Sequence, residues 1–169
     1  QGGALCNGGA LSLTDCTFKG NTATAGGLGT EGGGALFLSS SNTMTVNNCT
    51  FLGNEVTNSG YGGAIFHDYG TVGVVNSTFS ANGAPLGSGG GIGLVPDDEG
   101  VTCRVRNCTL TLNSANNGGG LYNSPSDGTI EVYSSIVSGN TATTSNPDVD
   151  GTFADGGNNL IGDATGSAS

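Results

Sequence analysis

A twelve-residue pattern recurs five times without a gap, and it constrains the fold more than any other feature of the chain. The copies are residues 10–21 (ALSLTDCTFKGN), 43–54 (TMTVNNCTFLGN), 71–82 (TVGVVNSTFSAN), 102–113 (TCRVRNCTLTLN) and 129–140 (TIEVYSSIVSGN). Positions two and four are apolar and flank a polar or small residue, which is typical of a strand with one buried face. Position nine is apolar again, so a second inward-facing segment should follow a bend. A repeat of this kind predicts a stacked architecture.

The last position of every copy is asparagine, and the sixth position is nearly always a small polar residue. The asparagines are Asn21, Asn54, Asn82, Asn113 and Asn140. Because asparagine tolerates a left-handed backbone, we expect a sharp corner at each of them. Copies stacked about 4.8 Å apart would let each amide hydrogen-bond its neighbours in a ladder. An Asn-rich turn without stacking is the alternative, but the gapless register favours the ladder. The sixth position predicts a second corner, at Asp15, Asn48, Asn76, Asn107 and Ser134.

A shorter glycine-rich element precedes each copy. It reads GGALCN, GGALFL, GGAIFH, GGGIGL and GGGLYN and begins at residues 2, 33, 62, 89 and 118, which gives coils of 27–31 residues. Its fourth position is aliphatic and should face inward, whereas the next position, with Phe37, Phe66 and Tyr122, should face outward. With the two halves of the twelve-residue copy, this gives three short strands per coil and no helical period. We therefore expect an all-β fold, a right-handed parallel β-helix of about five coils.

Residues 1–163 are expected to form one domain. Its closing segment, residues 141–163, lacks a clean sixth copy but offers Phe153, Leu160 and Ile161 to cover the last coil. Residues 164–169 resemble a tail or linker. The sequence opens within a repeat and without methionine, so we expect a processed or partial polypeptide whose first coil is covered by another segment or a partner.

Charge and composition exclude several classes of function. The net charge is −10, from 13 acidic and 3 basic residues, which argues against nucleic acid as a partner. No apolar run approaches the roughly 18 residues of a membrane span, so direct membrane insertion is not expected. The acidic, lysine-poor composition fits an extracellular or cell-surface protein.

The five cysteines contain no CxxC pair, which argues against a zinc site. Cys16, Cys49 and Cys108 share the seventh position of the copies. Cys16 and Cys49 would lie on adjacent coils, within the Cα separation that a disulfide allows. Small buried thiols that fill a narrow core are the favoured alternative.

The repeat units resemble those of a known group of proteins. The glycine-rich element and the T-x-x-V-x-N-S/C-T-F-x-G-N pattern resemble bacterial right-handed parallel β-helix repeat proteins, which are related in pattern to polymorphic outer-membrane protein repeats. Residues 145–163 (SNPDVDGTFADGGNNLIGD) are similar to the end of the helix in choice-of-anchor Q domain proteins. The resemblance implies a bacterial protein that is extracellular or anchored at the cell surface. It supplies no catalytic motif, and the further C-terminal region that such proteins generally carry is not seen in this sequence.

Few residues offer chemistry. Arg104 and Arg106 should have Glu131 and Tyr133 directly beside them on the next coil, which would make a small polar site for a uronate. A surface ion pair and an arginine–tyrosine stack are the favoured alternative. His67 is expected at a coil edge rather than as a base.

Acidic residues give weak candidates for Ca²⁺, the one cofactor considered. They are Asp97, Asp98, Glu99, Asp148, Asp150 and Asp155, and none fits an EF-hand loop. A solvated acidic loop is the favoured alternative.

These observations favour a non-enzymatic scaffold for adhesion or assembly, with other protein subunits as partners. Phe37, Phe66 and Tyr122 would provide a lateral contact. The alternatives are a carbohydrate-binding or polysaccharide-degrading β-helix that recognises surface glycans, and a Ca²⁺-stabilised adhesin.

Overall fold

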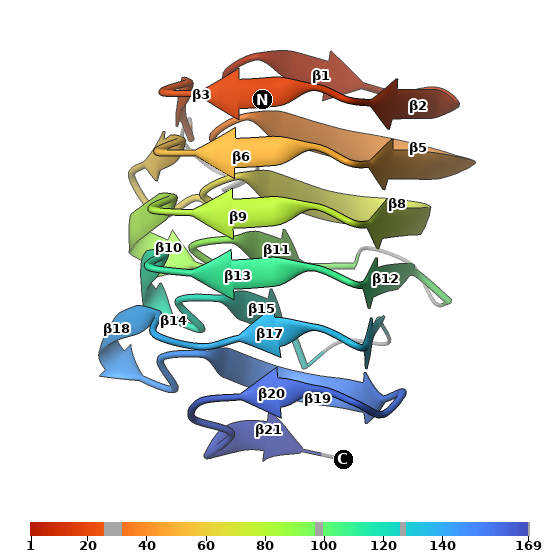
Figure 1. The fold of residues 1–169 in the computed structure, drawn as a ribbon. Helices are drawn as coiled ribbons and strands as arrows, with labels where there is room; N and C mark the ends of the chain where they lie inside the picture. The colour runs from red at the N-terminus through yellow and green to blue at the C-terminus, as the bar shows by residue number, and fades with distance from the viewer. Residues whose placement is uncertain (26–31, 97–99, 126–127, 169) are drawn as a thin grey trace.

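The chain winds into a stack of coils in a computed structural model that describes residues 1–25, 32–96, 100–125 and 128–168 (Figure 1). Register partners along one face lie 31, 29, 27, 29 and 28 residues apart, at Leu5, Leu36, Ile65, Ile92, Leu121 and Val149. The strand pairs are parallel, and the described residues form no helix, hence none that could span a membrane. The expected all-β parallel β-helix is confirmed.

Three sheets line the stack; the first two run along its whole length, and the third ends at the fifth coil. The first sheet contains β1 (Leu5–Asn7), β2 (Leu11–Thr14), β5 (Leu36–Asn47), β8 (Ile65–Val75), β11 (Ile92–Leu94), β12 (Thr102–Arg106), β15 (Leu121–Asn123), β16 (Thr129–Tyr133), β19 (Val149–Asp155) and β21 (Gly166–Ala168). The second contains β3 (Thr17–Lys19), β6 (Thr50–Leu52), β9 (Thr78–Ser80), β13 (Thr109–Thr111), β17 (Ile136–Val137) and β20 (Leu160–Ile161). The third contains β4 (Thr22–Thr24), β7 (Glu55–Thr57), β10 (Gly83–Ser88), β14 (Ser114–Asn117) and β18 (Thr141–Ser145).

The assignment of strands to the three faces differs from the expectation. The glycine-rich element and the first half of the twelve-residue copy share the first sheet, and in β5 and β8 they form one continuous strand. The third sheet is built from the segment after the ladder asparagine, which the sequence pattern treats as a variable connector. The strands β4, β7, β10 and β14 each bury a single small apolar residue in a separate cluster, at Ala23, Val56, Ala84 and Ala115. One such residue per strand is too weak a signal to stand out in the sequence.

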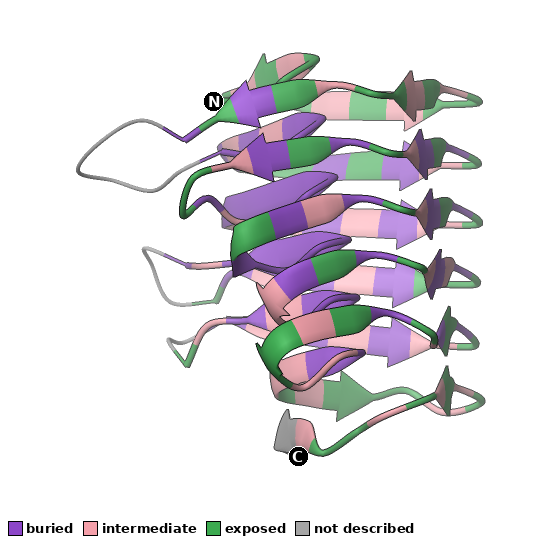
Figure 2. Cartoon of the chain, turned by 90° about the vertical axis from the view of Figure 1, so that its left-hand side faces the viewer, coloured by how far each residue is buried: buried purple, intermediate pink, exposed green. Residues whose placement is uncertain are grey.

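The core consists of aligned columns of identical or similar side chains. Leu36, Ile65, Ile92 and Leu121 have no exposed surface, and buried residues fill the middle coils in Figure 2. The ring centroids of Phe51 and Phe79 lie 4.6 Å apart in a parallel stack. Each buried side chain of this size contributes about 1.5–3 kcal/mol.

Two left-handed residues mark the corners of each coil, but the ladder asparagines are not among them. The sixth position of the copy has φ between 46° and 56°, as expected, at Asp15, Asn48, Asn76, Asn107 and Ser134. The second corner lies one residue before the ladder asparagine, at Gly20, Gly53, Ala81, Leu112 and Gly139, with φ between 55° and 74°. The expected left-handed conformation at the ladder position is therefore wrong. There the asparagine side chain turns into the coil, where its role is hydrogen bonding rather than backbone geometry.

The C-terminal segment continues the stack in register. Phe153 pairs with Ile130, and Ile161 pairs with Val137, so both cover the last full coil as expected. Leu160 does not cover it, because this side chain points outward and is 59% exposed. Gly166–Ala168, expected to belong to a linker, form β21 against β19.

Candidate functional site

The most extensive polar arrangement is a ladder of amides inside the coil. At its first step, the backbone N and the Nδ2 of Asn21 both donate to Oδ1 of Asn54, at 3.1 and 2.8 Å. The same pair of bonds, at 3.0 and 2.9 Å, joins Asn54 to Asn82, Asn82 to Asn113, and Asn113 to Asn140. Asn54, Asn82 and Asn113 have no exposed surface.

A second hydrogen on each Nδ2 binds the backbone of the preceding coil. Asn82 donates to the carbonyl oxygen of Phe51 at 3.1 Å, and Asn54 donates to that of Phe18 at 3.0 Å. Both amide hydrogens and the amide oxygen are thus used at each inner step, as buried polar groups require.

Asp148 ends the ladder. Its Oδ1 accepts from the backbone N and Nδ2 of Asn140, at 2.9 and 2.8 Å, and its Oδ2 accepts from the backbone N of Asp163 at 2.8 Å. The side chain is 3% exposed. In the preceding coil the same position is Gly120, where a Cβ would lie 2.9 Å from the Nδ2 of Asn140. Asp148, a weak Ca²⁺ candidate by sequence, is thereby a structural acceptor.

The other acidic candidates do not converge on one point. Asp150 accepts from Nδ2 of Asn146 at 2.9 Å, and Asp155 accepts from Nδ2 of Asn159 at 2.7 Å. Asp97, Asp98 and Glu99 lie outside the described residues. Within the described ranges, no three His, Cys, Asp or Glu side chains gather as a metal site would require.

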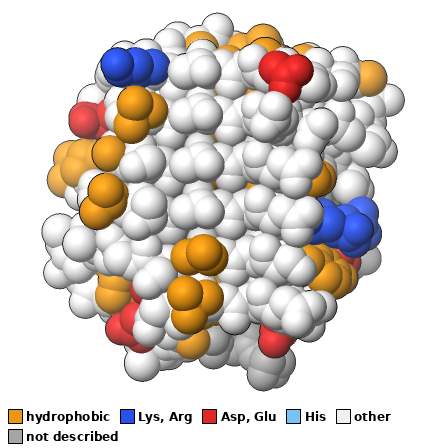
Figure 3. Space-filling view, in the orientation of Figure 1, with side chains coloured by type: hydrophobic (Ala, Val, Ile, Leu, Met, Phe, Trp, Pro, Cys, Tyr) orange, Lys and Arg blue, Asp and Glu red, His pale blue; other side chains and the backbone are white. Residues whose placement is uncertain are grey.

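The arginine cluster takes the arrangement of paired surface groups. Nε of Arg104 lies 2.8 Å from Oε2 of Glu131, with 42% and 22% of the two side chains exposed. The guanidinium of Arg106 lies 4.6 Å from the ring centroid of Tyr133. Figure 3 shows Lys and Arg side chains at the edge of the molecule near β12. The cluster contains one carboxylate, so it does not supply the carboxylate pair of a glycoside hydrolase.

Gly156 holds this cluster in place, and the repeat pattern gave no indication of it. A Cβ at Gly156 would lie 1.8 Å from Cδ1 of Tyr133, so the ring rests directly on the glycine backbone. Tyr133 is therefore held between Gly156 on one side and Arg106 on the other.

The outward aromatic residues form a stack rather than an open contact surface. The ring centroids of Phe37 and Phe66 lie 5.3 Å apart, and Tyr61 stacks on Phe66 at 5.9 Å and on Tyr122 at 5.8 Å. Tyr61 fits because Gly93 leaves this column empty in the fourth coil; a Cβ there would lie 3.1 Å from that of Tyr61. Phe66 is only 1% exposed, so its expected role in a lateral contact is wrong.

His67 is fully buried instead of lying at an exposed coil edge. It pairs with Leu38 and Leu94 in an inward column, and its Nδ1 lies 3.4 Å from the carbonyl oxygen of Leu38. Among the described residues, its Nε2 has no hydrogen-bond partner. Burial lowers the pKa of His67 to about 4, so the ring is neutral at physiological pH and inaccessible to a substrate.

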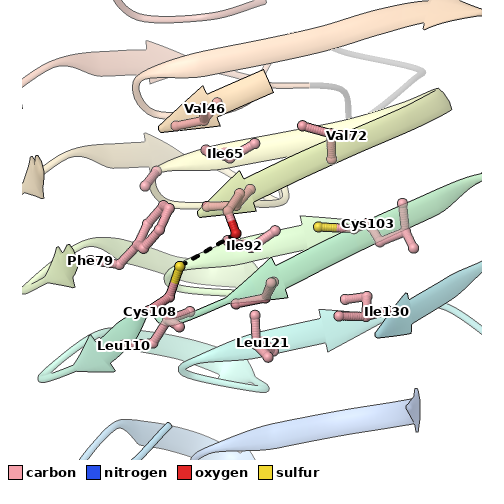
Figure 4. Close-up of a cluster of buried hydrophobic side chains, with 14 of the residues drawn as sticks. Val46, Ile65, Val72, Phe79, Ile92, Cys103, Cys108, Leu110, Leu121 and Ile130 are labelled. Carbon is pink, nitrogen blue, oxygen red and sulfur yellow. Dashed lines mark hydrogen bonds between the residues drawn. The ribbon is translucent and has the colours of Figure 1, made fainter. Parts of the chain in front are cut away.

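The five cysteines are free thiols. Cys103 and Cys108 point into the core among aliphatic and aromatic side chains (Figure 4). Burial raises the pKa of Cys103 to about 12 and that of Cys108 to about 11, which leaves almost no reactive thiolate. Cys49 is also buried, whereas Cys16 is partly exposed and Cys6 is exposed.

Comparison with known proteins identifies the fold at the level of a family. The family described as right handed beta helix region matches residues 1–161. No curated protein and no solved structure matches the chain. The family match covers nearly the whole stack and agrees with the right-handed coil expected from the sequence.

Proposed function

The chain belongs to the right-handed β-helix family, and we propose that it is a non-enzymatic scaffold of an extracellular or cell-surface protein. Right-handed β-helices occur both in adhesive or structural proteins and in polysaccharide-degrading proteins. The likeness of the repeats to polymorphic outer-membrane and choice-of-anchor Q proteins favours the surface location. In this role the coil stack is a rigid segment used for adhesion or assembly.

The observation that carries this proposal is the use of polar side chains to hold the coils together. Asp148 completes the ladder, Glu131 pairs with Arg104, and His67 is buried and neutral. A general acid or base must reach the proton that it transfers on a substrate. These three groups instead contact other parts of the same stack.

A patch on the second sheet supports a role in assembly. Position eight of the copies is threonine in four coils and points outward, but it becomes Ile136, 44% exposed, in the fifth. Ile136 pairs with Leu160, which is 59% exposed. Figure 3 shows hydrophobic side chains at the lower end of this face, below a mostly polar surface. Adjacent exposed apolar residues of this kind are typical of protein contacts.

Association of the purified chain tests the scaffold proposal. Light scattering and electron microscopy over a range of concentrations should show assemblies that dissociate on dilution. The double variant Ile136→Thr, Leu160→Thr restores the residue found in the other coils and should weaken association. Thr78→Ser, in the same outward column, is the matched control. Strictly monomeric particles at every concentration would contradict the assembly role.

Carbohydrate recognition is the second candidate, and the arginine cluster favours it. Arg106 is exposed, and its guanidinium carbon lies over the ring of Tyr133, where the guanidinium can donate to the carboxylate of a uronate. A panel of polyuronates and neutral glycans, with and without Ca²⁺, tests binding and turnover. Turnover that disappears in Arg106→Ala but persists in Lys19→Ala would overturn the scaffold proposal. A melting temperature lowered by chelators would instead support a Ca²⁺-stabilised adhesin.

A further inference from the structure

Cys16 and Cys49 lie side by side on the first two coils. Each directly precedes a strand of the second sheet, and Thr17 pairs in register with Thr50. The backbone N of Thr50 donates to the carbonyl oxygen of Cys16 at 2.9 Å. Neighbouring strands lie about 4.8 Å apart, a Cα separation within the range that disulfides span.

The two thiols also share an orientation. Sγ of Cys16 donates to the carbonyl oxygen of Thr14, and Sγ of Cys49 donates to that of Asn47, both at 3.2 Å. Burial raises the pKa of Cys49, and the adjacent Cys16 thiol adds to this effect. Both side chains therefore turn the same way, each towards the carbonyl oxygen two residues before it.

The remaining cysteines do not share this arrangement. Ser77 separates Cys49 from Cys108 in the column, and its Oγ accepts from the backbone N of Cys49 at 3.1 Å. Cys103 and Cys108 are buried in the core, and Cys6 belongs to the outward column beside Phe37. The pair on the first two coils is thus distinguished by register, shared side-chain orientation and the partial exposure of one member.

We propose that Cys16 and Cys49 are an oxidisable pair that forms a disulfide by exchange with a small-molecule disulfide, RSSR. The Cys16 thiolate attacks one sulfur of RSSR, which gives the mixed disulfide Cys16–S–SR and releases RS⁻. The Cys49 thiolate then attacks Sγ of Cys16, forms the Cys16–Cys49 bond and releases the second RS⁻. The two cysteine protons leave with the released thiols, so the pair is oxidised and RSSR is reduced to two RSH. The proposal is independent of the scaffold function.

The disulfide would fasten the first coil to the second. Leu5, Leu13 and Phe18 of the first coil are only partly buried, although their counterparts in the second coil are fully buried. Because each coil of a solenoid contacts only its neighbours, a coil whose core side chains are partly buried opens more easily than one whose core is fully buried. Oxidation should therefore raise the melting temperature by about 5–15 °C.

Oxidation of the intact chain, followed by tryptic digestion and mass spectrometry, tests the proposal. The variant Cys6→Ser removes the exposed competing thiol and is incubated with oxidised glutathione at mildly alkaline pH. Trypsin cleaves after Lys19 and so separates Cys16 from Cys49, which lies in fragment 20–104. Non-reducing mass spectrometry should show fragments 1–19 and 20–104 joined until dithiothreitol is added, and the melting temperature should rise.

A matched variant makes the test decisive. Cys49→Ser, in the Cys6→Ser background, places serine where the third and fifth coils already carry it, so folding is preserved. This variant should stop at glutathione bound to Cys16, with no link between the fragments. The proposal is overturned if Cys6→Ser itself stops at the mixed disulfide or does not react. It is also overturned if the link persists in Cys49→Ser, because Cys103 would then be the partner.

Discussion

Removal of one side-chain amide from the buried middle of the ladder should lower the free energy of unfolding by an amount that follows from its hydrogen bonds. Oδ1 of Asn82 accepts from the backbone N and Nδ2 of Asn54, while its Nδ2 donates to Asn113 Oδ1 and the Phe51 carbonyl oxygen. Asn82→Ala removes all four bonds. Asn54 Nδ2 keeps Phe18, but the backbone N of Asn54 loses its bond in a fully buried site. With about 1–3 kcal/mol per buried group left unsatisfied, we expect a loss of about 3–5 kcal/mol.

Equilibrium unfolding in urea, followed by far-UV circular dichroism, measures this loss. The matched variant is Asn21→Ala at the start of the ladder, where a partly exposed side-chain amide donates one bond to Oδ1 of Asn54 and the bond from the backbone N of Asn21 is kept. It should cost only about 1 kcal/mol, because water can replace part of the lost bonding. Equal destabilisation by the two variants would refute the claim that burial and continuity give the ladder its strength.

Further substitutions probe the glycine beside Tyr133, one left-handed corner and the buried histidine. Gly156→Ala should displace the Tyr133 ring and lower stability by about 1–3 kcal/mol, whereas Gly73→Ala, with nothing within 4 Å of its Cβ, should be nearly neutral. Leu112→Gly should raise the free energy of unfolding in urea by about 1 kcal/mol, because an exposed leucine occupies a left-handed corner. An unchanged free energy of unfolding would contradict the corner assignment. The pKa of His67 is about 4 in the folded protein, below its ordinary 6.5. The stability that the buried neutral ring contributes is therefore full above pH 6.5 and is lost as the pH falls towards 4. Acidification should therefore destabilise the native chain by up to about 3 kcal/mol more than it destabilises His67→Leu. The same dependence of stability on pH in both proteins would contradict this.

The repeat unit and the register between coils could be predicted from the sequence, because a gapless period leaves few ways to align one copy with the next. The inward columns followed from side-chain alternation, and the Arg106–Tyr133 stack followed from placing one copy over the next. His67 could have been assigned correctly by the same reasoning. Its column contains Leu38 and Leu94 and lies two residues beyond an inward position, which predicts burial.

Features outside the repeats were beyond the reach of the pattern. Tyr61 enters the aromatic stack only because Gly93 vacates a place in another coil, and Gly156 is required only by the ring above it. Asp148 reaches the ladder from the glycine-rich element instead of from the ladder position. Each depends on side-chain positions in three dimensions, which residue spacing does not encode.

Hydrogen exchange of the ladder amides tests most directly whether buried polar groups hold this stack together. Nuclear magnetic resonance can follow the side-chain amide protons of Asn54, Asn82 and Asn113 beside those of the exposed corner residue Asn107. The ladder protons should exchange as slowly as backbone amides of the central strands, since both require the coils to separate. Ladder protons that exchange as fast as those of Asn107 would contradict the account.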